Sequence, residues 1–374
     1  MANPSAKPKT AVKKAATDLV ALRARIDEID RSLVSLISER ARIAQRVGHS
    51  KLKAGQESFY RPDREVSVLR AITESNPGPL SNEVLITLFR EIMSACLAQQ
   101  DPLKVAFLGP EGTFTQQAVF KQFGHSIQAL PLASIDQVFK EVEAKVCEFG
   151  VVPIENSTEG TVSHTADMFL TSPLKICGEV ELRIHQHLMG KLGDWRRAKR
   201  ICSHAQSLAQ CRGWLDEHLP KVERVAVASN AEAARRARDE EGTLAIAGEA
   251  AAALYQLNVL VPEIEDRADN STRFLILGRS VMPPTGKDRT TVLLSAADTQ
   301  GAGSLLKLLE PFARAGITLT RLESRPSRRK KWDYVFLADF AGHVDDPPVK
   351  KALAEVHKVA SLLKVLGSYP QAVQ

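Results

Sequence analysis

Cysteine is scarce in this 374-residue chain and follows no spacing typical of a cysteine-built site. The five cysteines are odd in number, and no two of them form a Cys-x-x-Cys pair. A disulfide framework or a zinc centre needs paired or regularly spaced thiols. We therefore expect reduced thiols, a cytoplasmic protein and no metal site. The five are Cys96, Cys147, Cys177, Cys202 and Cys211.

Apolar runs long enough to span a bilayer are missing, and the first residues lack the apolar core of a signal peptide. We expect no membrane partner. Aromatic residues make up only 5% of the chain, which weighs against a surface that stacks nucleic-acid bases. The net charge of +6 suits small anionic substrates as well as nucleic acid, so charge does not decide between them. Residues 1–17, rich in Lys, Ala and Pro, are interpreted as a disordered tail.

Residues 18–101 carry the pattern of a helical domain. Apolar residues recur every three or four positions along its first half, which predicts a long helix with a coiled-coil-like seam. Arg40 falls on that seam, and Lys51 shares its face if the helix continues through Gly48. Arg23 points roughly 100° away on the helical wheel, so it could reach the same site only from another subunit. The seam residues are Leu19, Leu22, Ile26, Ile29, Leu33, Leu36, Ile43 and Val47.

Two more helices are expected in this domain. One begins at Pro62 and ends before Asn76; the other begins near Ser81, a favourable N-cap, and runs to about Gln100. Gln100 extends the apolar stripe of the third helix, so Arg40, Lys51 and Gln100 face the interior of the domain. A buried charge is costly unless an anion meets it. The alternative is a helical dimerisation domain with one buried ion pair.

This helical region resembles the all-helical chorismate mutases, which are intertwined homodimers. The resemblance rests on Ala21-Leu22-Arg23, Glu39-Arg40, Lys51, Arg64-Glu65 and Gln100. It implies that Arg23 of the partner subunit and Arg40 bind the two carboxylates of chorismate. It further implies that Lys51 and Gln100 hydrogen-bond the ether oxygen and that Glu65 binds a hydroxyl, with Arg64 and Cys96 also at the site. Two positions depart from the family pattern: Arg61 stands where some members have an acid, and Cys96 where some have a serine.

Strands and helices alternate through residues 104–280, in two blocks, which predicts two α/β lobes with a site between them. An Asn-Ser-Thr triplet ends one predicted strand at residues 156–158, and a second triplet precedes another at residues 270–272. We interpret the two triplets as belonging to two lobes that face one cleft; the alternative is that both are polar turns. Gly109 to Thr115 joins a strand to a helix N-terminus, an arrangement that can bind anions.

Four motifs in this region resemble prephenate dehydratase: Gly109-Pro-Glu-Gly-Thr-Phe-Thr115, Pro153-Ile-Glu-Asn-Ser157, Ser203-His204-x-Gln206 and Thr272-Arg273-Phe274. The resemblance implies that Thr272 donates a hydrogen bond to the leaving hydroxyl and that Arg273 binds a carboxylate. His204 is either a base or a structural histidine. No cofactor motif is present, and none is expected to be needed. The remaining expected substrate-binding residues are Thr113, Asn156, Ser157, Ser203, His204, Gln206 and Phe274.

Residues 289–370 show the β-α-β-β-α-β order of a ferredoxin-like fold. They resemble an ACT amino-acid-sensing domain, in which Glu323-Ser324-Arg325-Pro326 and the turn at Gly301-Ala302 would bind phenylalanine. In that turn, Gln300 to Gly303 departs from the usual Pro-Gly-Ala-Leu. The basic loop 328–331 is interpreted as a solvated hairpin tip.

The sequence therefore predicts a multi-domain protein: an all-α N-terminal module, a two-lobed α/β domain and a ferredoxin-like α+β domain. The favoured hypothesis is a homodimeric or larger bifunctional chorismate mutase and prephenate dehydratase that binds chorismate, prephenate and, as inhibitor, L-phenylalanine. Three rivals stay open: a monofunctional dehydratase with a helical scaffold, a two-lobed anion-binding regulator without turnover, and a nucleic-acid-binding protein.

Overall fold

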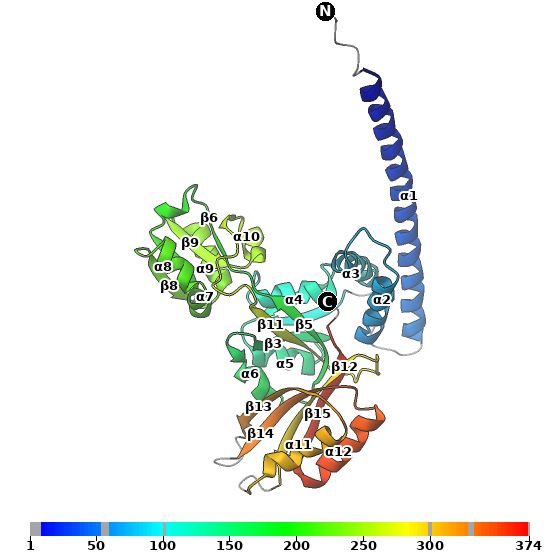
Figure 1. The fold of residues 1–374 in the computed structure, drawn as a ribbon, viewed down its shortest axis with the longest axis vertical. Coiled ribbons are helices and arrows are strands. Elements are labelled where there is room, and N and C mark those ends of the chain that lie inside the picture. The colour runs from blue at the N-terminus through cyan, green and yellow to red at the C-terminus, as the bar shows by residue number, and fades with distance from the viewer. Residues whose placement is uncertain (1–8, 54–59, 100–101, 298–300, 328–332, 373–374) are drawn as a thin grey trace, which may run out of the picture.

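The structure, a computed structural model, describes residues 9–53, 60–99, 102–297, 301–327 and 333–372. It contains a helical N-terminal domain, two α/β lobes and a C-terminal domain with one sheet and two helices (Figure 1). The three-part fold class predicted from the sequence is confirmed. All five cysteines are free and buried.

The helical domain is built on one long helix, α1 (Lys9–Lys53), of 45 residues. At 1.5 Å per residue it is about 67 Å long. It runs through Gly48 without a break, as the placing of Lys51 on the Arg40 face requires. The predicted tail at 1–17 differs from the structure from Lys9 onward, where the backbone is helical; Ala and Lys are strong helix formers. Residues 1–8 lie outside the described residues.

Helices α2 (Pro62–Glu74) and α3 (Asn82–Ala98) begin as the sequence predicts. Pro62 is the first residue of α2, and the Ser81 side chain caps α3 by accepting a hydrogen bond from the backbone N–H of Val84. Helix α3 packs against both α2 and the C-terminal half of α1, whereas the N-terminal half of α1 projects away from the molecule (Figure 1).

The predicted apolar seam of α1 is exposed in the single chain. Side chains such as Ile29 and Leu33 remain 45% and 49% exposed. A soluble protein rarely leaves a continuous apolar stripe without a covering surface.

The first lobe is a six-stranded sheet with the order β2-β1-β3-β11-β5, and β4 pairs with β3. Strands β1, β2 and β3 are parallel, and β11 runs antiparallel between β3 and β5. Its elements are β1 (Lys104–Leu108), α4 (Phe114–Phe123), β2 (Gln128–Leu132), α5 (Ile135–Glu143), β3 (Phe149–Asn156), β4 (Gly160–Thr161), α6 (Ser163–Met168), β5 (Lys175–Arg183) and β11 (Ser271–Gly278).

The second lobe is inserted between β5 and β11, so the chain crosses between the lobes twice. Its five-stranded sheet has the order β10-β6-β9-β7-β8. Its elements are β6 (His187–Gly190), the 3₁₀ turn Trp195–Arg197, β7 (Arg200–His204), α7 (Ala205–Gln210), α8 (Arg212–His218), β8 (Glu223–Val227), α9 (Asn230–Asp239), β9 (Thr243–Ala247), α10 (Glu249–Tyr255) and β10 (Asn258–Val261).

The assignment of the two triplets to two lobes was wrong. Both lie in the first lobe, because β11 returns from the second lobe and pairs with β3, which sets Thr272 opposite Asn156. The Ser157 hydroxyl accepts a hydrogen bond from the Ser271 N–H at 2.9 Å, and the Asn156 amide donates one to Asn270 at 2.8 Å. The triplets therefore bind each other rather than face each other across a cleft.

The C-terminal domain has the sheet order β13-β14-β12-β15, the ferredoxin-like order, with two helices on one face. The last helix of the predicted order, α12, ends at Val359, and the chain continues directly as the strand β15. Leu293, Leu337 and Tyr369 of this sheet share a buried core with the first lobe. The elements are β12 (Asp288–Ala296), α11 (Ser304–Arg314), β13 (Leu319–Pro326), β14 (Tyr334–Ala341), α12 (Pro347–Val359) and β15 (Ala360–Pro370).

Candidate active sites

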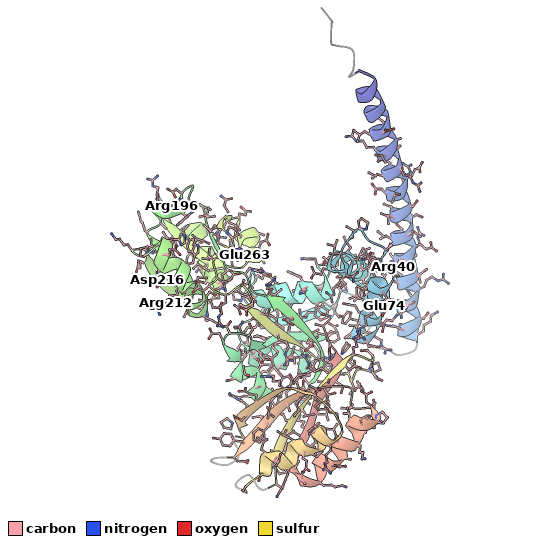
Figure 2. The ribbon with its side chains drawn as sticks, in the orientation of Figure 1. Arg40, Glu74, Arg196, Arg212, Asp216 and Glu263 are labelled. Carbon is pink, nitrogen blue, oxygen red and sulfur yellow. The ribbon has the colours of Figure 1, made fainter. Side chains whose placement is uncertain are left out.

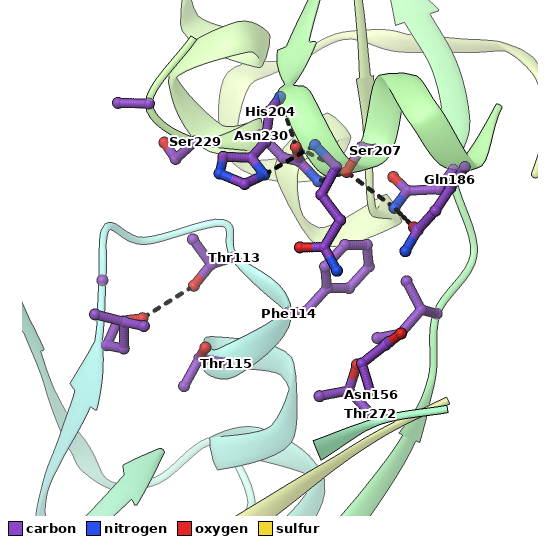
Figure 3. A pocket seen from close by; sticks show the side chains of 16 residues that line it. Thr113, Phe114, Thr115, Asn156, Gln186, His204, Ser207, Ser229, Asn230 and Thr272 are labelled. Atoms are coloured by element: carbon purple, nitrogen blue, oxygen red, sulfur yellow. Dashed lines mark hydrogen bonds between the residues drawn. The ribbon is translucent and has the colours of Figure 1, made fainter. Parts of the chain in front are cut away.

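A cavity of about 240 Å³ lies between the two α/β lobes (Figure 3). The first lobe contributes residues at the ends of β1, β3 and β11 and at the start of α4; the second lobe contributes the starts of α7 and α9. Polar strand ends and helix N-termini meet here, the usual location of ligand sites in α/β folds. The lining residues are Leu108, Gly109, Thr113, Phe114, Thr115, Asn156, Ile184, Gln186, His204, Gln206, Ser207, Gln210, Ala228, Ser229, Asn230 and Thr272.

Asn156 and Thr272 form a hydrogen-bonded pair on the first-lobe wall. The Asn156 amide Nδ2 donates to Thr272 Oγ1 at 2.9 Å. The orientation of that amide is fixed, because Asn156 Oδ1 accepts from the backbone N–H groups of Thr158 and Glu159, both at 3.0 Å. Since Thr272 Oγ1 accepts this bond, its own O–H remains available to donate into the cavity.

Asn230 organises the opposite wall. Its Oδ1 accepts hydrogen bonds from the His204 N–H (3.1 Å) and Ser207 Oγ (3.1 Å) and lies 3.0 Å from Ser203 Oγ. Ser203 is fully buried and donates to the Ile246 carbonyl at 2.7 Å, so it supports the wall from behind. Predicted residue Ser157 likewise does not line the cavity but ties β3 to β11.

Of the described residues that line the cavity, only His204 has an ionisable side chain. Its Nδ1 accepts from the Gln206 N–H at 3.3 Å as the N-cap of α7. In the neutral ring the proton is then on Nε2, which makes His204 a hydrogen-bond donor in this geometry rather than a base.

Sequence reasoning missed several lining residues, among them Asn230, Ser207, Gln186 and Gln210. Gln186 Nε2 donates to Ser207 Oγ at 3.1 Å and to Gln210 Oε1 at 3.2 Å. A signal for Asn230 was present: Ser229-Asn230 separates the predicted strand ending at Ala228 from the helix starting at Ala231, and a polar pair at such a junction is a common ligand position.

Arg273 and Phe274, both expected at the site, point elsewhere. Successive residues of a strand face opposite sides of the sheet, so Arg273 lies on the face of β11 away from Thr272 and binds Asp339 of β14. Phe274 is 2% exposed and packs in the first-lobe core. The contact expected between Arg273 and a substrate carboxylate is not formed in this arrangement.

The helical domain places its predicted residues on all three helices. Arg40 lies on α1 where that helix passes α3, and it is half-buried (Figure 2). Cys96 and Glu65 are buried on α3 and α2, whereas Arg23 and Arg64 are exposed. Glu65 pairs with Arg90 at 3.2 Å, and burial raises its pKa. Gln100 lies outside the described residues.

The departure at Arg61 has a local explanation. Arg61 forms a two-pronged ion pair with Asp63, at 2.7 and 3.2 Å. Both groups act on Lys51: burial lowers its pKa, the Arg61 charge lowers it further, and Asp63 opposes this. Asp63 therefore supplies a carboxylate near Lys51 two residues beyond the position where the acid was expected.

In the C-terminal domain, β12 and β13 both run antiparallel to β14 and are therefore parallel to each other. The turn at Gly301-Ala302, which follows β12, and Pro326 at the end of β13 thus lie at the same end of the sheet. Ser324 is exposed, and Glu323 is half-buried. Residues 328–331, the predicted basic hairpin tip, lie outside the described residues.

Comparison with known proteins explains the order of the three domains. Family models match residues 22–101 as chorismate mutase type II, 105–281 as prephenate dehydratase and 290–358 as the ACT domain. A bifunctional chorismate mutase/prephenate dehydratase of Stutzerimonas stutzeri is 56% identical over 96% of this chain and 99% of its own length.

The chain belongs to the bifunctional chorismate mutase/prephenate dehydratase family.

Two solved structures resemble the dehydratase and ACT part. Prephenate dehydratase of Arthrobacter aurescens in complex with L-Phe is 35% identical, with a TM-score of 0.67 over 72% of this chain and 90% of its own. GqqA, described as a novel type of quorum quenching acylase, is 30% identical, with a TM-score of 0.65 over 72% of this chain and 98% of its own. Because proteins described as a dehydratase and as an acylase share this fold, the reaction must be inferred from the residues of the site and not from the fold.

Acyl transfer through a serine or threonine requires a base within hydrogen-bonding distance of the hydroxyl. Among the described residues that line the dehydratase cavity, no hydroxyl is bonded to His204. Among all the residues that the structure describes, no group of three or more His, Cys, Asp or Glu side chains is placed so that it could hold a metal ion. None of the described helices is long and apolar enough to cross a membrane.

The Asn156–Thr272 pair yields a first prediction. Asn156→Ala removes the donor that orients the Thr272 hydroxyl, and we expect prephenate kcat to fall about 100-fold. Steady-state assays of phenylpyruvate formation measure this. Chorismate turnover by the same preparation is the control, because the mutase domain does not contact Asn156. An unchanged prephenate kcat would contradict the assigned role.

Proposed function

We propose that prephenate reacts in the cavity between the lobes, with Thr272 as the donor to the departing hydroxyl. The observation that carries this proposal is the Asn156–Thr272 bond at the cavity wall, in which Thr272 Oγ1 accepts, so that its O–H is available to donate to a substrate. In the reaction the bond between ring carbon and carboxylate breaks, its electrons enter the ring, and hydroxide leaves from the opposite ring carbon. CO₂ and water are released; the Thr272 hydroxyl donates a hydrogen bond to the departing oxygen, and the proton that converts hydroxide into water comes from solvent.

A neutral threonine is a weak acid, so its contribution is hydrogen bonding to charge that develops on the leaving oxygen. Aromatisation of the ring supplies the driving force. The two carboxylates of prephenate would lie against described lining residues of which only His204 has an ionisable side chain. Helices α4 and α9, each of 10 residues, begin at the cavity with the N-caps Thr113 and Ser229. Their N-terminal N–H groups and positive dipole ends favour carboxylates without a buried cation.

We further propose that the mutase site is shared between two chains. Arg40, Lys51, Arg64, Glu65, Cys96 and Gln100 come from one chain and Arg23 of the partner subunit completes the site. The exposed apolar stripe of α1 supports this, because a second α1 would cover it. The Claisen rearrangement needs no proton transfer, so holding the compact conformer of chorismate and stabilising charge on its ether oxygen suffice.

L-phenylalanine is proposed to bind the ACT domain near Gly301, Ala302 and the Glu323–Pro326 segment and to inhibit the dehydratase. The chain would then act in phenylalanine biosynthesis. Support comes from the arrangement of these residues at one end of the sheet, and from the L-Phe complex of the Arthrobacter relative.

Two substitutions test the placing of the reactions. Thr272→Val keeps the shape of the side chain and removes its donor, so prephenate kcat should fall by about 100-fold or more while chorismate is still converted to prephenate. Arg40→Ala should give the reverse pattern. Both activities are measured on each purified variant, so each reaction is the control for the other. If Thr272→Val retains full dehydratase activity, the reaction is not placed at this residue.

A mixing experiment tests the shared mutase site. Arg23→Ala and Arg40→Ala chains are each expected to be inactive toward chorismate. Unfolded together and refolded, they should recover about a quarter of the wild-type activity, because half of random dimers are hybrids and each hybrid has one intact site. If each chain supplied both arginines to its own site, mixing would restore nothing.

Ser324→Trp tests the proposed phenylalanine site, since a large side chain would fill the exposed face of β13. The concentration of L-phenylalanine that halves prephenate turnover should rise at least about tenfold. The matched control is Lys351→Trp, which places the same large side chain on the exposed face of α12. Ser361→Trp is unsuitable because the Ser361 hydroxyl hydrogen-bonds to β12. If L-phenylalanine inhibits Ser324→Trp and the wild type equally, the Glu323–Pro326 segment is not part of the phenylalanine-binding site.

A further inference from the structure

The face of β11 opposite the cavity is bound to the ACT domain. Arg273 Nη2 donates a short hydrogen bond to Asp339 Oδ2 on β14, and Arg273 also lies 3.5 Å from Glu179 and 3.6 Å from Glu155. Asp339 is fully buried, and its Oδ1 accepts from Thr291 Oγ1 at 2.7 Å. The residue that precedes Arg273 is Thr272, so the donor hydroxyl and this interdomain ion pair are separated by one peptide unit.

The neighbouring strand repeats the arrangement. Asn156 pairs in register with Thr272, and Glu155 pairs with Arg273. Glu155 lies 3.4 Å from Arg321 Nε on β13, whose Nη2 also donates to Thr161 at 2.8 Å. Two adjacent residue pairs of strands β3 and β11 therefore face opposite sides of the sheet. Asn156 and Thr272 face the cavity, whereas Glu155 and Arg273 face the ACT sheet.

Because these charged side chains are buried, each must keep its ion-pair partner within close distance. Arg273 and Glu179 side chains are 14% and 5% exposed, and Arg289 of β12 also binds Glu179, at 2.5 Å. Burial alone would lower the pKa of Arg273, but Asp339 and Glu179 hold it above its usual value, so the guanidinium stays charged. A buried charge that loses its partner has no solvent to replace it. The position of Arg273 is therefore tied to that of Asp339.

We propose that Arg273 and Asp339 are positioning residues of the dehydratase: their ion pair lets the ACT domain hold the Thr272 hydroxyl in register with Asn156. The inference rests on the proposed placing of the reaction at Thr272. It gives Arg273 a role other than carboxylate binding and makes the ACT domain part of the support of the catalytic strand.

The Glu155–Arg321 pair extends the same support to Asn156. Arg321 stands two residues before Glu323 on β13, within the strand that carries the proposed phenylalanine-binding segment. A shift of β13 or β14 relative to the first lobe is thus transmitted to both members of the Asn156–Thr272 pair. A displacement of about 1 Å at a reacting group is enough to lower a rate about 100-fold.

The test is a double-mutant cycle on prephenate turnover. Asp339→Asn removes the nearest anionic partner of Arg273 and leaves only the more distant Glu179 and Glu155. We expect kcat to fall at least about tenfold with KM changed less than about threefold. The double variant Arg273→Gln with Asp339→Asn replaces the ion pair by two amides that can bond to each other. It should be at least about fivefold more active than Asp339→Asn alone.

Lys364→Met is the matched control. Lys364 Nζ donates to the carbonyls of Phe169 and Ser172, at 2.9 and 2.7 Å, across the same interface, but it contacts neither β3 nor β11. It should lower the melting temperature without lowering kcat. If Lys364→Met and Asp339→Asn reduce kcat equally, or if the cycle is additive, the interface has a structural role only and the proposal is overturned.

If Asp339→Asn does not fold, Thr291→Val replaces it in the test. This near-isosteric change removes one donor to Asp339 and should lower kcat about two- to fivefold; no change in kcat would overturn the proposal. Thr272→Val distinguishes a failure of the proposed reaction site at Thr272 from a failure of the proposed positioning role of Arg273 and Asp339. If it retains activity, the placing of the reaction fails, whereas a normal Asp339→Asn enzyme beside an inactive Thr272→Val enzyme rejects only the positioning role.

Discussion

The antiparallel pairing of β11 with β3 is the contact on which the dehydratase part of the molecule depends. It returns the chain from the second lobe to the first, so that the cavity has walls from both. It also sets Thr272 opposite Asn156 and Arg273 opposite Glu155. One strand pairing thereby defines the face toward the cavity and the face toward the ACT domain, so that a shift of either strand moves residues on both faces.

The helical domain joins this unit through buried polar contacts as well as apolar ones. Tyr60 packs between Phe123 and Phe149, with ring centroids 5.2 and 5.3 Å apart, and accepts a hydrogen bond from Gln122 at 3.1 Å. Nearby, Glu65 pairs with Arg90. An expected mutase residue therefore lies at the junction between the helical domain and the first lobe, and both candidate sites are built from elements that meet at this junction.

Sequence periodicity predicted the fold class and most of the long elements because each depends on local spacing. The helices at Pro62 and Ser81 began where the start signals stood. Short strands such as β2, which contains Pro131, and β6 carried no clear period and were missed. The pairing of β11 with β3 was also missed, since hydrophobic pattern identifies a strand but not its neighbours. The direction of Arg273 was available in principle: adjacent strand residues cannot both face one cavity.

The insertion of the second lobe between β5 and β11 has a consequence for the order of folding. Asn156 and Thr272 are 116 residues apart in the chain, so the first sheet receives β11, the strand between β3 and β5, only after the whole second lobe has been synthesised. Until then the edges of β3 and β5 that β11 later covers are unpaired, and open apolar edges associate with other chains. The second lobe contains its own strands and can form beforehand. Pairings of such long range slow folding, and the interval before β11 arrives is when the nascent enzyme is most exposed to aggregation.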